Sequence, residues 1–147
     1  MAFPAAHVSE IAGVIQLSVA PVFLLAGVGA IVNAMSTRLG RAVDRARDLE
    51  SEIDGADAAK TARIHDELRA ISRRARLVTW AIALAVVCAL LVTLLLIAAF
   101  VDAFLALDLS FVLAVIFVGA LIAFSASLLL FLREILIASA NLRIGPH

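Results

Sequence analysis

The sequence predicts an all-α integral membrane protein with three transmembrane helices and a cytoplasmic antiparallel helical hairpin between spans one and two. The first observation is composition: 64% of the residues are hydrophobic and only 16% are charged, whereas a soluble domain is about half apolar and a quarter charged. The second is that residues 11–35, 77–101 and 109–132 contain no Asp, Glu, Lys, Arg or His. Each block exceeds the roughly 20 apolar residues that cross a bilayer as a helix. The third is that most charges gather in residues 36–76. We expect a single membrane domain over residues 1–147.

The first span, residues 11–35, is interrupted by residues that are uncommon among the leucines and valines of a spanning helix. No Lys or Arg precedes this run, and it is longer than the core of a cleaved signal peptide, so we expect a retained span. The proline removes a backbone hydrogen bond and predicts a kink, the small residues allow another helix to approach, and the polar residues are costly against lipid. The candidate pore or helix-packing residues are Gln16, Ser18, Pro21, Gly27, Gly29 and Asn33. The small residues Ala26, Ala30 and Ala34 also recur every four positions.

The polar segment, residues 36–76, contains two helical patterns separated by a turn signal. Apolar or small residues recur at steps of three or four along each pattern, which indicates two helices with narrow apolar seams. Asp54-Gly55-Ala56-Asp57 between them is typical of a turn. Because each seam continues into a spanning segment, we expect a coiled-coil-like hairpin that stands on the membrane. The seams comprise Leu39, Ala42, Ala46, Leu49 and Ile53, and then Ile64, Leu68, Ile71, Ala75 and Val78.

Charges within the polar segment are graded from base to tip. The basic residues expected to face lipid headgroups, where each contributes about 1 kcal/mol, are Arg38, Arg41, Arg73, Arg74 and Arg76. The acidic tip, a candidate binding surface for a partner, comprises Asp48, Glu50, Glu52, Asp54 and Asp57. Asp44, Asp48 and Glu52 share a helix face and could attract divalent cations, but a hydrated ridge balanced by neighbouring arginines is the favoured interpretation.

The second and third spans, residues 77–101 and 109–132, are joined by a short loop, residues 102–108, with two acids and no base. Gly119, Ala123 and Ser127 repeat every four positions in the third span and predict a second packing face. The remaining residues, 133–147, combine the apolar residues Ile135, Leu136, Leu142 and Ile144 with polar ones and predict a short interfacial segment.

The distribution of basic residues predicts the orientation. The polar segment holds ten of the 12 Lys and Arg residues, and Arg133 and Arg143 are the other two. The positive-inside rule therefore places the hairpin and the C-terminus in the cytoplasm and the N-terminus outside.

Chemical motifs are sparse. The three histidines lie on different segments, no phosphate-binding glycine loop is present, and the spans hold no ionisable residue of the kind that proton carriers use. The formal net charge of zero does not favour nucleic acid. We therefore expect a protein that is not an enzyme, with no catalytic residues, no cofactor, no metal and no nucleic-acid partner.

Several motifs are similar to those of a known family. They are Ile15-Gln16-Leu17, Pro21-Val22-Phe23-Leu24-Leu25, Gly27, Gly29, Asn33, Arg38-Leu39, Arg41, Asp44-Arg45, Arg47 and Phe131-Leu132-Arg133-Glu134. In these the chain resembles, over about residues 9–144, small bacterial inner-membrane proteins known only as a domain of unknown function (DUF2721-like). The resemblance implies a bacterial multi-pass membrane protein and supplies no activity.

Two functions remain open at this point. Three spans form a thin bundle, so we expect a homo-oligomer in the lipid bilayer. The first function is a scaffold or regulatory protein whose acidic tip binds a cytoplasmic protein. The alternative is a homo-oligomeric channel or pore for ions or small solutes, lined by the first span.

Overall fold

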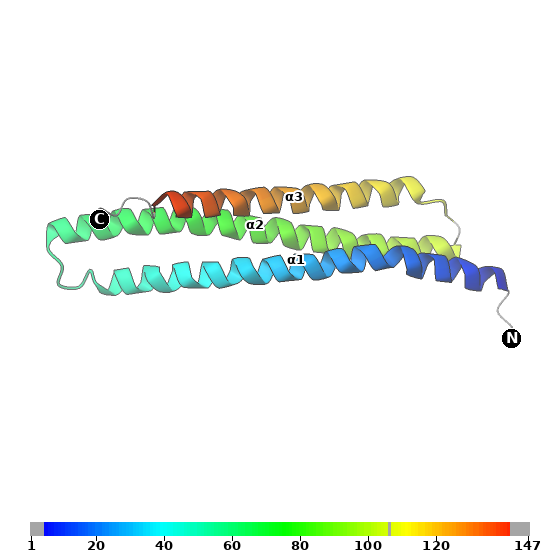
Figure 1. The fold of residues 1–147 in the computed structure, drawn as a ribbon, viewed down its shortest axis with the longest axis horizontal. Coiled ribbons are helices and arrows are strands. Elements are labelled where there is room, and N and C mark those ends of the chain that lie inside the picture. Colours follow the sequence, from blue (N-terminus) through cyan, green and yellow to red (C-terminus); the bar gives the residue numbers. More distant parts are fainter. Residues whose placement is uncertain (1–4, 106, 142–147) are drawn as a thin grey trace. The chain divides into compact units, whose positions relative to one another are not determined.

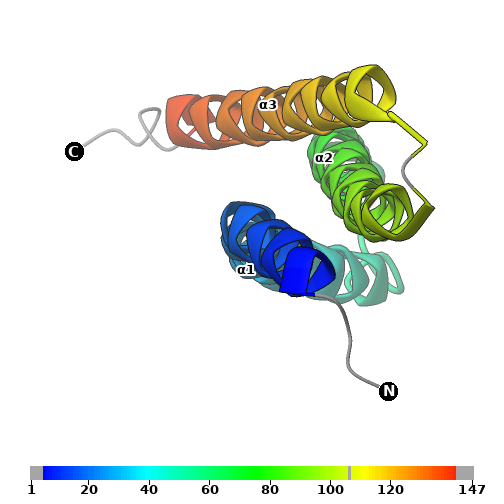
Figure 2. The ribbon, with the colours of Figure 1, turned by 90° about the vertical axis from the view of Figure 1, so that its right-hand side faces the viewer.

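The computed structural model of the protein describes residues 5–105 and 107–141, and within them the regular elements are three helices (Figure 1). Helix α1 comprises Ala5–Ser51, α2 comprises Ala58–Leu105 and α3 comprises Ser110–Asn141. The same three helices are labelled in the second view (Figure 2). Each is long and apolar enough to cross a membrane, which confirms the all-α class and the three predicted membrane helices.

The helices are longer than the predicted spans. Helix α1 continues without interruption through Pro21 into the polar segment, and α2 includes the second half of that segment together with the second span. Helix α3 continues past the predicted end of the third span to Asn141. The predicted interfacial segment, residues 133–147, thus begins within α3, and its last six residues lie outside the described residues. Its position at the interface stays a prediction.

The connection between α1 and α2 lies at the turn signal of the sequence. Gly55 has a φ of 94°, a conformation in which a residue with a Cβ is strained. Asp57 then caps α2, because its Oδ1 accepts a hydrogen bond of 2.7 Å from the backbone N–H of Lys60. That N–H belongs to the first turn of the helix and has no partner within it.

Replacing Asp57 by alanine is expected to lower the free energy of unfolding by about 1 kcal/mol, because the first turn of α2 loses its capping acceptor. Asp54→Ala is the matched control: it removes an exposed acid from the same turn, and Asp54 makes no ion pair among the described residues. Hydrogen exchange at Lys60 and thermal unfolding in detergent measure the two effects. Equal losses for both variants would contradict the capping role.

The connection between α2 and α3 is shorter than the predicted loop of residues 102–108. Asp102 lies within α2, and its Oδ1 accepts a hydrogen bond of 3.1 Å from the backbone N–H of Leu109. Asp108 has a φ of 53°, which aspartate tolerates better than most residues. The loop prediction was wrong in extent because an aspartate at a helix end can bond to the next segment, so its charge does not require the helix to stop.

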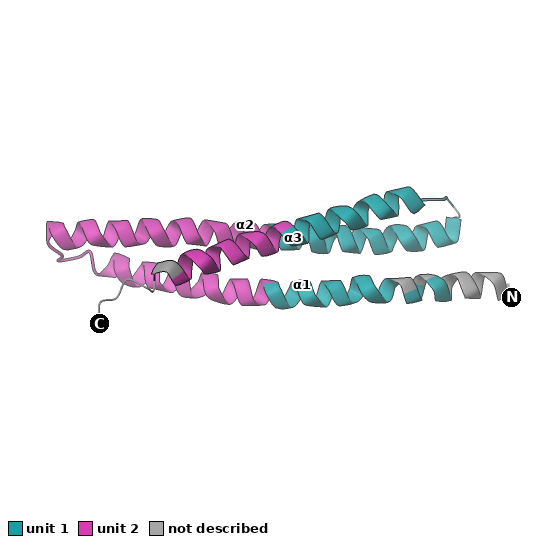
Figure 3. Cartoon of the chain, turned by 45° about the horizontal axis from the view of Figure 1, so that its top comes forward, with its two compact units in different colours: residues 1–31, 84–125 teal, residues 32–83, 126–147 magenta. Residues whose placement is uncertain are grey.

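The chain divides into two compact units, each with a narrow core (Figure 3). Unit 1 contains residues 1–31 and 84–125, and unit 2 contains residues 32–83 and 126–147. The core of unit 1 includes Val28, Ala85, Cys88, Val92, Leu95, Ala120 and Ala123. The core of unit 2 includes Met35, Leu49, Ile64, Val78, Ala81 and Ser127. Both predicted seams of the polar segment are buried or half-buried at every position.

Large apolar side chains cover much of the outer surface. Phe111 is 81% exposed, Phe23 is 74% exposed and Leu129 is 66% exposed. An apolar surface of this extent is unfavourable in water and typical of contact with lipid. Together with the three spanning helices, it identifies the chain as a membrane protein.

The small residues of α3 form a packing contact with α2 within each unit. In unit 1, a Cβ added to Gly119 would lie 3.8 Å from Leu91 Cδ1, and Ala123 is buried. In unit 2, Ser127 is fully buried and its Oγ donates a hydrogen bond of 2.6 Å to the carbonyl oxygen of Ala81. The predicted second packing face therefore faces inward, as the spacing indicated.

Candidate functional site

The candidate site is built around Glu134, a carboxylate of unit 2 that follows the apolar part of α3. Its side chain is only 4% exposed. Burying a carboxylate in an apolar environment is costly unless it is paired and hydrogen-bonded. The contacts of Glu134 within unit 2 therefore determine what this position can do.

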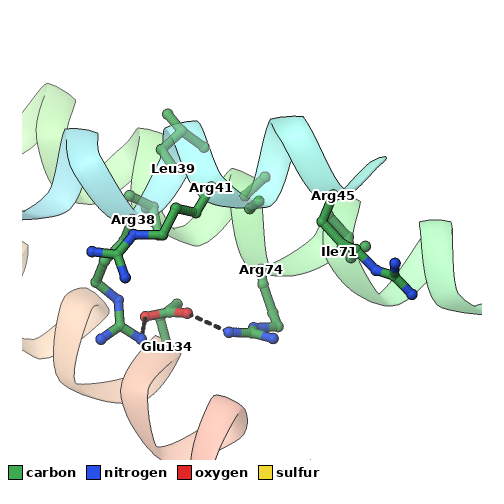
Figure 4. A pocket seen from close by; sticks show the side chains of 10 residues that line it. Arg38, Leu39, Arg41, Arg45, Ile71, Arg74 and Glu134 are labelled. Carbon is green, nitrogen blue, oxygen red and sulfur yellow. Dashed lines mark hydrogen bonds and ion pairs between the residues drawn. The ribbon is translucent and has the colours of Figure 1, made fainter. Parts of the chain in front are cut away.

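Two arginines from the other helices contact the Glu134 carboxylate (Figure 4). Arg74 of α2 donates a hydrogen bond of 2.9 Å from Nη2 to Oε1. Arg38 of α1 places Nη2 at 3.1 Å from Oε2. The Arg38 guanidinium also lies 5.7 Å from the centroid of the Phe131 ring, within cation–π range. We call Arg38, Arg74 and Glu134 the clamp, because the Glu134 carboxylate of α3 contacts one arginine of α1 and one arginine of α2.

The ion pairs of the clamp leave two of its buried polar atoms without a hydrogen bond within the described chain. Oε2 of Glu134 accepts no hydrogen bond among the described residues, although Arg38 lies at ion-pair distance. Nε of Arg74 is likewise buried without an acceptor. The two guanidinium groups carry one more positive charge than the carboxylate neutralises, and one of their donors remains available.

The sequence places the clamp where three apolar runs end. Arg38 follows the last residue of the first run, Met35, and Arg74 precedes the first residue of the second run, Leu77. Glu134 follows the end of the third run, Leu132. The clamp therefore lies where the apolar run of each helix gives way to polar residues.

A cavity of about 370 Å³ adjoins the clamp within unit 2. Four arginines and Glu134 contribute polar side chains to its lining, and α1 and α2 supply apolar ones (Figure 4). The lining residues are Arg38, Leu39, Arg41, Ala42, Arg45, Ile71, Arg74, Ala75, Val78 and Glu134. Basic side chains around a concave, partly apolar surface can bind an anion.

The basic residues predicted to face lipid divide into two groups. Arg38 and Arg74 are half-buried and contact Glu134. Arg41, Arg73 and Arg76 are exposed. Contact of any of them with headgroups stays a prediction.

The candidate residues of the first span lie mostly on the outer surface. Gln16, Gly27, Gly29 and Asn33 are exposed, and a Cβ added to either glycine would meet nothing within 4 Å. Ser18 is half-buried and Pro21 is buried. Ala26, Ala30 and Ala34 are also exposed, so this stripe of small residues, unlike that of α3, is left uncovered in the described chain.

The acidic residues of the predicted tip have different environments. Glu52 pairs with Lys60 at 3.4 Å, and Asp57 caps α2. Asp48, Glu50 and Asp54 are exposed and make no ion pair with any described residue. Among the residues that the structure describes, no three His, Cys, Asp or Glu side chains are placed to hold a metal ion.

Glu134 is the residue that sequence reasoning did not select. Its signal was present, since Phe131-Leu132-Arg133-Glu134 was among the family-like motifs and Glu134 lies two positions after the end of the third span. The identity of its partners was not accessible, because Arg38 and Arg74 are 96 and 60 positions away in the sequence.

The comparisons with known proteins give a family and no activity. The family described as "Protein of unknown function (DUF2721)" matches residues 18–144. No curated protein matches the chain, and no solved structure matches it. The matched region contains the clamp, the polar segment and nearly all of the three spans. The chain therefore belongs to the DUF2721 family of membrane proteins of unknown function.

Proposed function

We propose that the protein is a non-enzymatic scaffold or regulatory protein of a bacterial inner membrane, in which the polar segment is a cytoplasmic antiparallel hairpin that binds a protein partner. The observation that carries this proposal is the set of three exposed acids at the tip, Asp48, Glu50 and Asp54, without ion-pair partners among the described residues. Unpaired exposed charges leave a surface available for a basic partner.

Contacts between the parts of α1 and α2 that form the polar segment support a stable hairpin with this tip at its end. Arg45 of α1 donates two hydrogen bonds, of 3.2 and 3.0 Å, to Oε1 of Glu67 in α2. Both side chains are about half exposed, so the pair contributes at most about 1 kcal/mol. The buried seam residues Leu49 and Ile64 add apolar contact area, which is the larger stabilising term.

The proposed orientation places the N-terminus outside and the hairpin and C-terminus in the cytoplasm. It rests on the ten basic residues of the polar segment, two of which, Arg38 and Arg74, contact Glu134 just after the third span.

Neutralising the tip by Asp48→Asn, Glu50→Gln and Asp54→Asn is expected to reduce binding of a cytoplasmic partner about fivefold or more, the factor that roughly 1 kcal/mol represents. The full-length protein is crosslinked in cells, purified in detergent, and its bound proteins are quantified. The control is Asp44→Asn with Asp66→Asn, two exposed acids that pair with arginines on their own helices. The same bound proteins in the same amount for both variants would contradict a tip-bound partner.

A homo-oligomer with a pore is the second candidate, because Gln16 and Asn33 are both exposed in the single chain. A polar side chain that faces lipid is costly, so association through the first span would give each a partner or water. Native mass spectrometry is expected to show a species larger than one chain. Flux of small solutes into liposomes is expected to fall at least about tenfold in Gln16→Leu with Asn33→Leu if these residues line a pore. A monomeric species in native mass spectrometry, or unchanged flux in the double variant, would contradict the pore and leave the scaffold as the proposed function.

A further inference from the structure

The cavity beside the clamp has the composition of an anion-binding site. Its lining includes the guanidinium groups of Arg38, Arg41, Arg45 and Arg74 and one carboxylate, that of Glu134. Its volume of about 370 Å³ lies within the range of about 300–1,000 Å³ typical of small-ligand pockets. The apolar residues Leu39, Ile71 and Val78 form part of the same lining.

Positive charge remains in excess after every ion pair is taken into account. Glu134 serves both Arg38 and Arg74, and Glu67 neutralises Arg45. Arg41 has no acidic partner among the described residues. Two positive charges around this cavity are therefore uncompensated. They repel one another and attract an anion.

The available donors favour a phosphate group over other anions. Nε of Arg74 is buried and donates to no acceptor, and the guanidinium of Arg41 has no carboxylate to bind. Guanidinium groups bind phosphate oxygens through paired, charge-assisted hydrogen bonds, and a phosphate offers several acceptors to several arginines at once. Glu134 contributes by holding Arg38 and Arg74 at the cavity wall.

We propose that this cavity binds a phosphate group at the membrane junction. Because the clamp lies at the ends of the apolar runs, an anionic phospholipid can place its phosphate among the arginines and direct its acyl part toward Val78, the lining residue that belongs to the second run. Inorganic phosphate or a phosphorylated solute would use the same donors without the apolar contact. The site does not depend on the proposed binding at the hairpin tip.

The experiment uses the full chain and two probes. In the first arm, the protein is reconstituted into vesicles of phosphatidylglycerol and phosphatidylcholine in equal parts, and the lipids it retains are identified by native mass spectrometry. In the second arm, inorganic phosphate is titrated onto the detergent-solubilised protein by calorimetry. The variants are Arg41→Gln, which removes the unpaired lining charge, and Ala42→Leu, which fills the cavity without changing charge.

Arg63→Gln is the matched control, because Arg63 is an exposed arginine of the polar segment that does not line the cavity and does not belong to the residues expected to face lipid headgroups. We expect Arg41→Gln and Ala42→Leu each to weaken phosphate-group binding about fivefold or more while Arg63→Gln binds as the wild type does. Weaker binding by these two variants in the first arm identifies the ligand as a lipid, and weaker binding in the second arm identifies a free phosphate. Equal loss of binding for Arg41→Gln and Arg63→Gln, wild-type binding by Ala42→Leu, or no binding by the wild type in either arm would overturn the proposal. Circular dichroism verifies that each variant keeps its helical content.

Discussion

Glu134→Gln is expected to lower the free energy of unfolding by about 2–3 kcal/mol. The amide keeps the shape of the side chain but removes the charge that Arg38 and Arg74 share. Breaking a buried ion pair from one side costs about 3–5 kcal/mol when the remaining charge stays buried. The side chains of Arg38 and Arg74 are 38% and 32% exposed, so water recovers part of that cost and the expected loss is smaller.

Reversible unfolding of the protein in mixed micelles with increasing sodium dodecyl sulfate measures this loss, and Trp80, the single tryptophan, reports it by fluorescence. Arg133→Gln is the matched control, because Arg133 is exposed and adjacent to Glu134 on α3. Its effect is expected to remain within about 0.5 kcal/mol, as for most surface substitutions. A clamp without structural importance would give the two variants the same stability.

Ser127→Leu is expected to lower the free energy of unfolding by about 2–3 kcal/mol. The side chain of Ser127 is fully buried against α2, and its Oγ lies 2.6 Å from the carbonyl oxygen of Ala81. Leucine adds carbon atoms where the helices are in contact, which forces them apart, and removes the hydrogen bond. Ser127→Ala isolates the second contribution and is expected to cost about 0.6 kcal/mol, the average for such bonds between membrane helices.

The control for overpacking is Ser125→Leu, because Ser125 is exposed on the same helix two positions earlier. We expect Ser125→Leu to be neutral or slightly stabilising in a lipid environment, since a leucine there faces hydrocarbon. Measurement in the same micelles distinguishes the two positions. Ser127→Leu with wild-type stability would show that α2 and α3 do not pack through this residue.

Much of the fold was predictable from the sequence, because the signals involved are local or periodic. The three membrane helices follow from long uncharged runs, since transfer of apolar side chains from water acts on each residue wherever it lies. The turn before α2 follows from Asp54-Gly55, and the seams through Leu49 and Ile64 follow from their helical spacing. The C-terminal ends of α2 and α3 did not follow, because charged residues such as Asp102 and Glu134 can remain helical when tertiary contacts satisfy them.

Two stripes of small residues illustrate what only the tertiary structure decided. Ala26, Ala30 and Ala34 repeat at the same interval as Gly119, Ala123 and Ser127, and the sequence predicts a packing face from each. In the folded chain the second stripe packs against α2, whereas the first remains exposed. Spacing establishes that residues share a face of a helix, but it contains no information about which neighbour that face meets.

The candidate site depends on the same distinction. The order of residues in the sequence already shows arginines at the ends of the apolar runs, as expected because charged side chains are costly in hydrocarbon. That Arg38 and Arg74 meet on the carboxylate of Glu134, and that a cavity with unpaired positive charge lies beside them, required three separate helices at one register. The sequence by itself determined the three membrane-spanning runs and the place of each charge relative to them. The tertiary structure decided the pairing, because an ion pair forms only where packing brings its two groups within a few ångströms.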